Sequence, residues 1–371
     1  MNKAQFIEKL TALLSAQTEA ERAQLIAYYT EMIDDRIEAG MTEEDAVAAL
    51  GDPEALTREF QTNRGEITPL PKTTDAGAKY VDELREVRVH MKGANATIRR
   101  EPLANGAAAQ MQFSDPDAFE YRTEGGVLEI TEKPDQRRGL LGLDISINGI
   151  GFLQKNRSFT LILGEPIPDQ LIFDSHGGDM TVTDVVTTDQ MVLSTSSGDI
   201  KLTHCTCGRR AEITSRSGDV EGDTLEVRGD MKVESLSGDV TLRQIQAKNL
   251  RARTASGDVE IARSTSNTLT VSAASGDLRL NDNEAELIAC ETSSGDLDLA
   301  RPQSLMVQLN TSSGDITAQL INRAGGYKLD AKTRSGDISL PKHWTPPEGQ
   351  AAKAQVTAHT VAGDIKVNIL K

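Results

Sequence analysis

Ten aspartates, each directly after a glycine, recur at intervals of 19–27 residues from residue 179 onward and could do one of two kinds of chemistry. Their carboxylates could bind calcium, or they could accept hydrogen bonds from the backbone amides of tight turns. Calcium takes about six to eight oxygen ligands, and a copy offers at most one carboxylate and one Ser hydroxyl. We therefore expect structural turns and keep calcium as the alternative. The aspartates are Asp179, Asp199, Asp219, Asp239, Asp258, Asp277, Asp296, Asp315, Asp337 and Asp364.

Two other kinds of chemistry have less support in the sequence. A polysaccharide-cleaving site would use paired carboxylates, usually in a groove lined by aromatic side chains. Aromatic residues make up 4% of the chain and are missing from the repeat faces. "HCTC" at 204–207 offers three zinc ligands where a tetrahedral site needs a fourth, and Cys205 and Cys290 align with apolar residues of other repeats. We expect no catalytic residue, no metal and no cofactor.

The spacing of the aspartates indicates which elements position them. Successive steps are 20, 20, 20, 19, 19, 19, 19, 22 and 27 residues, which is typical of a repeat architecture. The residue after each aspartate is apolar in every copy, and most residues three after and six before it are also apolar. Alternation in steps of two indicates strands on either side of a Ser-Gly-Asp turn. We predict a mainly β protein, a β-solenoid of about ten coils of 19–20 residues, preceded by a small α-helical bundle.

The first 62 residues follow a helical pattern instead. Phe6, Leu10 and Leu13 have helical spacing, and capping signals such as Thr18 and Gly40 divide the segment into four short helices. One face gathers acidic residues, which are either a solvated helix face or a docking surface for a basic partner. These candidate docking residues are Glu31, Asp34, Asp35 and Glu38.

We expect four segments: a helical domain at 1–62, a linker at 63–83, irregular first coils or a cap at 84–170, and regular repeats at 171–371. An insertion at 133–157 combines basic residues with an apolar run, and it is either a hairpin folded on the solenoid or a patch for a membrane surface or partner. Its candidate residues are Arg137, Arg138, Leu140, Leu141 and Phe152. The chain ends on an apparently regular strand, which would leave that end of the solenoid open for self-association.

The overall composition and charge argue against some classes of partner. A net charge of −16 and a pI of about 4.9 argue against nucleic acid, which requires a basic surface. The first residues lack the apolar core of a secretory signal, and there is no apolar run of membrane-spanning length. Three cysteines are too few for a disulfide framework. We expect a cytoplasmic protein.

Two segments resemble known families. "AYYTEMIDDRIEAGMTEEDAVAALGDPEAL", at 27–56, is similar to the HAAS helical domain of bacterial proteins, with the paired Tyr28 and Tyr29 and the Leu-Gly-Asp-Pro ending. The repeat region, with the strands from about Val87 onward, resembles the family of putative adhesins of unknown function called toastrack, which is a β-solenoid. The resemblance implies no catalytic residues and a loose association with envelope-stress sensing and transcriptional control.

The sequence therefore favours a non-enzymatic interaction protein, in which the helical domain docks a regulator or membrane protein and the solenoid is a rigid scaffold or sensor. The alternatives are a self-assembling or adhesin-like surface protein and, with less support, a carbohydrate-active enzyme.

Overall fold

The computed structural model describes residues 3–13, 30, 33, 42, 43, 47, 84–103, 106–134, 157–323, 325–342 and 352–370. The chain divides into two compact units, Met1–Ala78 and Lys79–Lys371.

The first unit contains helix α1 (Lys3–Leu13), on the segment where helical spacing predicts one. Phe6 is fully buried, as are Ile33 and Val47 further along the unit. The backbone N–H of Lys3 donates to the carboxylate of Glu43 at 2.7 Å. The other three expected helices lie largely outside the described residues. No helix in the described part of the chain is long and apolar enough to cross a membrane.

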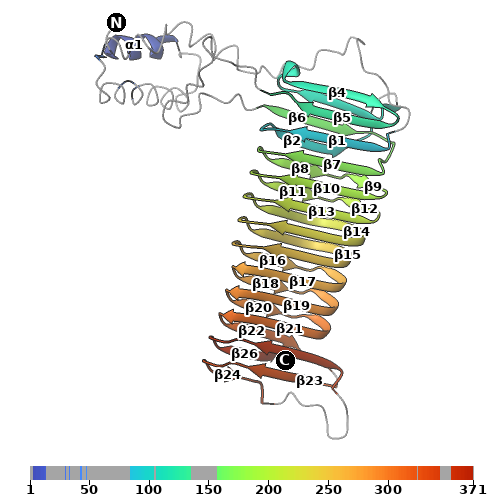
Figure 1. The fold of residues 1–371 in the computed structure, drawn as a ribbon, viewed down its shortest axis with the longest axis vertical. Helices are drawn as coiled ribbons and strands as arrows, with labels where there is room; N and C mark the ends of the chain where they lie inside the picture. Colours follow the sequence, from blue (N-terminus) through green and yellow to red (C-terminus); the bar gives the residue numbers. More distant parts are fainter. Residues whose placement is uncertain are drawn as a thin grey trace. The chain divides into compact units, whose positions relative to one another are not determined.

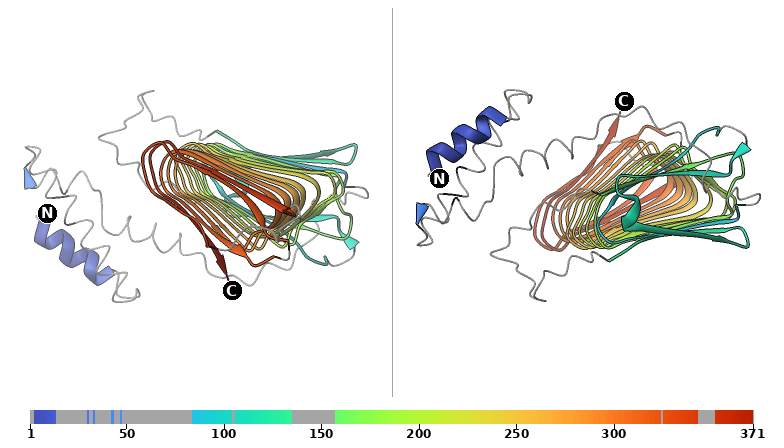
Figure 2. Two further views of the ribbon diagram at one scale, coloured as in Figure 1. Left: turned by 90° about the horizontal axis from the view of Figure 1, so that it is seen from below. Right: turned by 90° about the horizontal axis from the view of Figure 1, so that it is seen from above.

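The second unit is a β-solenoid, as predicted (Figure 1). Each regular coil contains a first strand, the Ser-Gly-Asp turn, a second strand and a return corner, and neighbouring coils pair in parallel. Viewed along the stack, the coils superpose as flattened rings (Figure 2). The strands of the first face are β1 (Glu86–Met91), β5 (Val127–Glu132), β7 (Gln170–Ser175), β10 (Gln190–Thr195), β13 (Arg210–Ser215), β17 (Thr265–Ser275), β19 (Glu284–Ser294), β21 (Gln303–Ser313), β23 (Tyr327–Lys332) and β25 (Ala354–His359).

The second face has its own set of parallel strands. These are β2 (Asn95–Arg100), β6 (Ser158–Leu163), β8 (Met180–Thr183), β11 (Ile200–Thr203), β16 (Val259–Ala262), β18 (Leu278–Asn281), β20 (Leu297–Ala300), β22 (Ile316–Ile321), β24 (Ile338–Ser339) and β26 (Ile365–Leu370). Two long strands, β14 (Val220–Ser235) and β15 (Val240–Thr254), run from the second face of one coil to the first face of the next, and the short strands β9 (Val186–Thr187) and β12 (Thr206–Cys207) lie on the return corner.

The predicted apolar columns form one continuous core. Val259, Leu278 and Leu297 stand directly above one another in the strand register, and each is at most 1% exposed. Burying a side chain of this size contributes about 1.5–3 kcal/mol, and no single coil could bury its own apolar face without neighbours.

The N-terminal end of the stack is closed by antiparallel strands. The β5–β6 coil is covered by β4 (Phe119–Glu124), which pairs with β5, and by β3 (Ala109–Phe113), which pairs with β6. The short 3₁₀ helix η2 (Pro116–Ala118) connects the two. Phe113 stacks on Phe119 and Phe159 with ring centroids 4.8 and 5.2 Å away, so aromatic rings fill the end of the core.

The C-terminal end differs from the sequence-based expectation. The last coil of the chain, β25–β26, does not form an open edge, because it lies between the β21–β22 coil and the β23–β24 coil (Figure 1). The outermost coil is therefore β23–β24, in which Ile338 is 44% exposed although it belongs to the inward column. The prediction of a plain final edge strand is wrong because every coil offers the same columns, so sequence order does not fix stacking order.

Because of this stacking order, the outermost coil is one that is poorly suited to pair with another chain. β24 has two residues, and the first strand of its coil, β23, carries Lys328 and Lys332. Short strands and lysines are common ways to discourage edge-to-edge pairing. The β1–β2 coil is also displaced from chain order, since it lies between β5–β6 and β7–β8.

Candidate functional site

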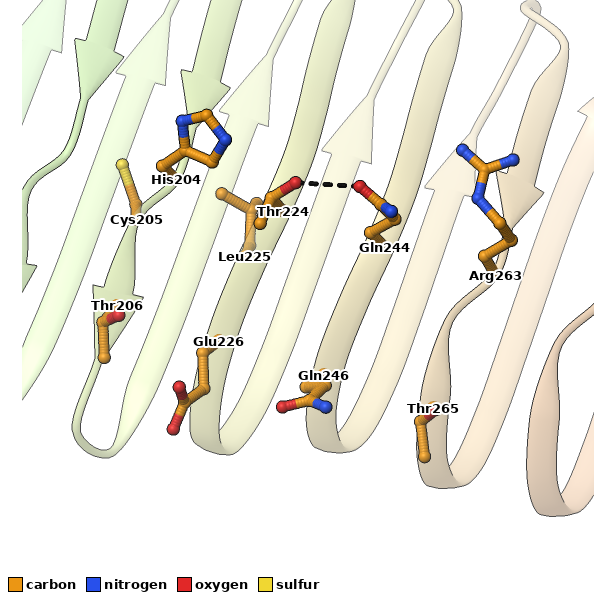
Figure 3. A pocket seen from close by; sticks show the side chains of 10 residues that line it. All are labelled: His204, Cys205, Thr206, Thr224, Leu225, Glu226, Gln244, Gln246, Arg263 and Thr265. Carbon is orange, nitrogen blue, oxygen red and sulfur yellow. Dashed lines mark hydrogen bonds between the residues drawn. The ribbon is translucent and has the colours of Figure 1, made fainter.

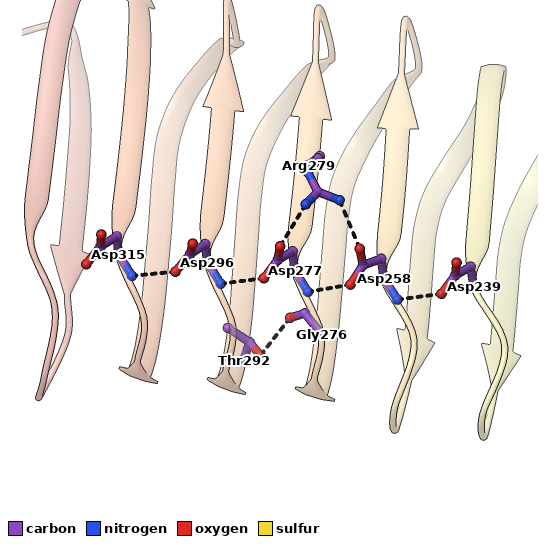
Figure 4. Close-up of polar contacts among 8 residues, drawn as sticks. All are labelled: Asp239, Asp258, Gly276, Asp277, Arg279, Thr292, Asp296 and Asp315. Atoms are coloured by element: carbon purple, nitrogen blue, oxygen red, sulfur yellow. Dashed lines mark hydrogen bonds and ion pairs between the residues drawn. The ribbon is translucent and has the colours of Figure 1, made fainter.

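The turn aspartates form a continuous hydrogen-bonded ladder along one edge of the solenoid (Figure 4). The backbone N–H of Asp277 donates to Oδ1 of Asp258 at 2.9 Å, and that of Asp296 donates to Oδ1 of Asp277 at 2.9 Å. The same bond, 2.8–3.1 Å long, links every neighbouring pair from Asp179 to Asp337 and follows stacking order at the end, from Asp315 to Asp364 to Asp337. Neighbouring carboxylates repel by roughly 1 kcal/mol, and these charge-assisted bonds oppose that repulsion.

An arginine adds a second bridge in the middle of the ladder. Arg279 donates to Oδ2 of Asp258 at 2.9 Å and to Oδ2 of Asp277 at 2.7 Å (Figure 4). The amide of Asp277 and then the Arg279 guanidinium hold the pKa of the Asp258 carboxyl below its usual value. Asp258 therefore stays ionised to a lower pH in the folded protein than an ordinary aspartate does.

The glycine of each turn lets the stacked backbones approach closely. A Cβ at Gly276 would lie 2.0 Å from the carbonyl oxygen of Gly257, and one at Gly257 would lie 2.2 Å from that of Gly238. Gly276 also has φ +155°, a conformation that side chains disfavour. Any larger residue would therefore push neighbouring coils apart.

A buried hydroxyl completes the turn. Thr254 Oγ1 accepts a hydrogen bond from the N–H of Gly257 at 3.0 Å and donates to the carbonyl of Gly238, one coil away, at 3.2 Å. Thr292 makes the equivalent bond to the carbonyl of Gly276 (Figure 4). The three parts of the Ser-Gly-Asp turn region thus all hold one coil to the next.

Two residues near the N-terminal end of the ladder were not predicted from the sequence, Asn95 and Glu132. The side-chain oxygen of Asn95 accepts the N–H of Asp179 at 3.0 Å and so starts the ladder. Glu132 is 3% exposed, and its Oε2 accepts the N–H groups of Lys92, Gly93 and Ala94 at 2.7, 2.9 and 3.1 Å.

An arginine accompanies this buried carboxylate. Arg157 lies 3.3 Å from the second carboxylate oxygen of Glu132. Burial opposes ionisation of Glu132, but the three amides and Arg157 outweigh it and hold its pKa below the usual value. Glu132 and Asn95 could not be identified from the sequence. Glu132 is one acid among many at a predicted strand end, and Asn95 belongs to no repeated motif.

The "HCTC" stretch does not converge on a site. Cys205 and Cys207 are buried free thiols, and burial raises the pKa of Cys205 to about 11. His204 instead points outward, with Nδ1 3.7 Å from the carboxylate of Asp184. Across the described residues, no three His, Cys, Asp or Glu side chains lie together in a way that could hold a metal ion.

A corner of each coil has an unusual backbone. The residue five positions after the turn aspartate has a positive φ of 50–57° in seven successive coils, although none of the seven is glycine. Such left-handed residues cost free energy, most of all when they are β-branched like Thr224. They are Asp184, His204, Thr224, Gln244, Arg263, Asp282 and Arg301.

This corner lines a shallow groove of about 520 Å³ that crosses four coils (Figure 3). Buried Cys205 and Leu225 lie at its base, between two rows of polar side chains. One row is His204, Thr224, Gln244 and Arg263, and the other is Thr206, Glu226, Gln246 and Thr265. Thr224 donates to the Gln244 side chain at 3.0 Å. The groove offers a regular series of hydrogen-bonding groups to an extended polar ligand.

Comparison with family models assigns the fold to a family. Residues 86–229 and 223–368 both match the model described as Toastrack DUF4097, and together they cover most of the chain. The chain is a Toastrack protein. Residues 5–59 match the HAAS model, as their resemblance indicated. No curated protein matches this Toastrack protein significantly.

Similar solved structures include three bacterial proteins. A putative lipid binding protein from Parabacteroides distasonis ATCC 8503 has 15% identity and a TM-score of 0.36, over 78% of this chain and 95% of that one. A putative adhesin from Bacteroides fragilis NCTC 9343 has 16% identity and a TM-score of 0.32, over 77% and 93%. A putative cell adhesion protein from Clostridium sporogenes ATCC 15579 has 12% identity and a TM-score of 0.19, over 78% and 93%.

Several predicted site residues of the Toastrack protein lie outside the described part of the chain. They are the acidic candidates Glu31, Asp34, Asp35 and Glu38 and the insertion residues Arg137, Arg138, Leu140, Leu141 and Phe152. Both sets stay predictions. The turn candidates Asp199, Asp219, Asp239, Asp258, Asp277, Asp296, Asp315 and Asp337 all lie in the ladder.

Proposed function

We propose that this Toastrack protein is a non-enzymatic interaction scaffold in a bacterial regulatory or envelope-stress pathway. In this proposal the helical module at 1–62 docks a partner protein in the cytoplasm, and the solenoid is its rigid frame or sensor. The observation that carries the proposal is the turn ladder. The aspartates, which are the residues most suggestive of chemistry, use one oxygen each to hold the next coil, and Arg279 occupies further oxygens.

The two family matches support separate roles for the helical module and the solenoid. A HAAS module at 5–59 precedes a solenoid that the Toastrack models match over 86–368. A stack tied at every turn keeps its surface geometry, and binding residues are effective when a rigid frame holds them. The corner groove is the part of that frame best suited to a polar partner, because eight side chains of its two rows face it with hydrogen-bonding groups.

The docking part of the proposal uses the acidic candidates. Glu31, Asp34, Asp35 and Glu38 recur on one face of the predicted helix, and such a face attracts a basic partner surface. A regulator or the cytoplasmic part of a membrane protein would fit this chemistry.

Affinity purification from native lysate tests the docking role. The baits are the full chain, a chain lacking residues 1–62, and a full chain with Glu31→Lys, Asp34→Lys, Asp35→Lys and Glu38→Lys. The matched control also reverses four acids, on the solenoid and outside the corner groove, with Glu260→Lys, Glu284→Lys, Glu286→Lys and Glu291→Lys. The proposal predicts one regulator or membrane protein that the full chain and the solenoid control retain and the other two baits lose. Recovery of the same proteins by all four baits would overturn the docking role of the helical module.

A further inference from the structure

The last coil of the chain occupies a slot between two earlier coils. Its strand β25 pairs with β21 on one side and with β23 on the other, while β26 pairs with β22 and β24. In the register, Ile365 stands between Ile316 and Ile338, and Val356 stands between Val307 and Leu329. The slot is thus one coil deep and is filled by the chain's own end.

Both walls of the slot bind the segment 354–370 through its turn. On one side the N–H of Asp364 donates to Asp315 at 2.8 Å, and Thr360 Oγ1 donates to the carbonyl of Gly314 at 3.1 Å. On the other side the N–H of Asp337 donates to Asp364 at 2.8 Å, and Thr333 Oγ1 donates to the carbonyl of Gly363 at 3.0 Å.

Four inward-facing apolar side chains of the segment are buried as deeply as those of central coils. Val356, Ala358, Ile365 and Val367 are at most 2% exposed. An empty slot would leave these contacts unmade on both walls.

The connection to the slot is long for a solenoid coil. Residues 340–353 separate β24 from β25, whereas residues 204–209 suffice between β11 and β13. Fully extended, the longer connection would span about 45–50 Å. Its length allows the segment to reach a slot beyond its own molecule.

We propose that the slot also accepts segment 354–370 of a second copy of this chain, so that two copies exchange their last coils and form a closed dimer. Every contact inside the slot is the same whether the segment comes from the same copy or the other one, so exchange requires no new interface. Reciprocal exchange fills both slots, which ends the assembly at two copies.

Disulfide trapping between two coexpressed full-length variants tests the exchange. Gln308 and Thr357 are register partners on the outer face of β21 and β25, at a spacing of about 4.8 Å that a disulfide can bridge. One differently tagged chain carries Gln308→Cys and the other carries Thr357→Cys. The proposal predicts a disulfide-linked heterodimer under non-reducing conditions. The native thiols are buried, so they are protected from this reaction.

Two controls make the outcome decisive. Thr270 and Ala289 are register partners on β17 and β19 in the middle of the stack, so chains with Thr270→Cys and Ala289→Cys should give no heterodimer. A single chain with both Gln308→Cys and Thr357→Cys should close its own disulfide, which reports the pairing itself. Exchange is overturned if the first mixture gives no heterodimer, or if both mixtures give it equally. Failure of the double variant to close would overturn the slot as well. None of these outcomes depends on whether residues 1–62 dock a partner.

Discussion

At the residue scale, three positions of the Ser-Gly-Asp turn region make different contacts with the neighbouring coil. The aspartate side chain accepts the amide of the next turn aspartate, and the glycine permits close backbone contact. The buried hydroxyl two residues before the Ser, as in Thr254, bonds to the neighbouring coil. Periodicity predicted that these residues form turns. It could not predict that the acceptor comes from the neighbouring coil, because a one-coil pattern contains no information about the next coil's atoms.

Replacing a turn glycine should damage the stack. Gly257→Ala would place a Cβ 2.2 Å from the backbone oxygen of Gly238, and backbone cannot move aside without separating the coils. We expect a loss of more than about 3 kcal/mol in unfolding free energy, measured by urea denaturation. The control Ser256→Ala, at the exposed neighbour, should stay within about 0.5 kcal/mol of the parent. Equal effects of the two substitutions would contradict the close-approach argument.

The ladder should need an oxygen rather than a charge. Asp258→Asn keeps an acceptor for the Asp277 amide, as Asn95 does for Asp179, and we expect a loss below about 1 kcal/mol because Arg279 sits at an exposed site. Asp258→Ala removes the acceptor and should cost about 1–2 kcal/mol. Thermal unfolding of both variants at neutral pH compares them. An asparagine variant as unstable as the alanine variant would show that the charge is the main contribution.

Glu132 should make stability depend on acid pH. Its pKa is lower in the folded chain than its ordinary value near 4.5, so its contribution is present above that value and is lost as pH falls through the folded pKa. Glu132→Gln should therefore lower the unfolding free energy by about 1–3 kcal/mol at pH 7, with the deficit shrinking below about pH 4. Melting temperatures of both proteins across this range report the deficit. A deficit that stays constant with pH would refute the buried-carboxylate argument.

At the element scale, the repeat columns predicted the coil but not its place in the stack. Ile316, Ile338 and Ile365 occupy the same column, so nothing in their spacing says that Ile365 stands between the other two. The corner column was also invisible, because Thr224, Gln244 and Arg263 are not residues that mark a left-handed turn. The stacking order and the left-handed corners could not be predicted, because both depend on contacts between coils that a repeat pattern does not show.

The backbone strain of the left-handed corner should be reduced by a substitution at Arg263. Arg263 has φ +53°, a conformation that asparagine tolerates better. Arg263→Asn should raise the unfolding free energy by about 0.5–1 kcal/mol. Arg251→Asn, at an exposed strand position, is the matched control and should be neutral or slightly destabilising. Urea unfolding of the two variants decides, and a destabilising Arg263→Asn would contradict the strain argument.

At the scale of the whole solenoid, the two ends are finished in different ways. Antiparallel β3 and β4 cover one end, while the other places the β23–β24 coil outside the final coil. Strand β25 is thereby paired on both sides, as are Ile365 and Lys366 of β26, which works against fraying and against filament growth from this coil. A scaffold function requires this property, since a frame that opens from its ends cannot hold a binding surface in place.

Hydrogen exchange of the full chain, followed by mass spectrometry, tests that rigid stack most directly. Amides in β25 and at Ile365 and Lys366 of β26 should exchange as slowly as those in β17, β19 and β21, because they lie between two coils and can open only with the stack. Rapid exchange across 354–370, with central strands still protected, would show a frayed end instead. That result would contradict both the inserted final coil and the rigid scaffold built on it.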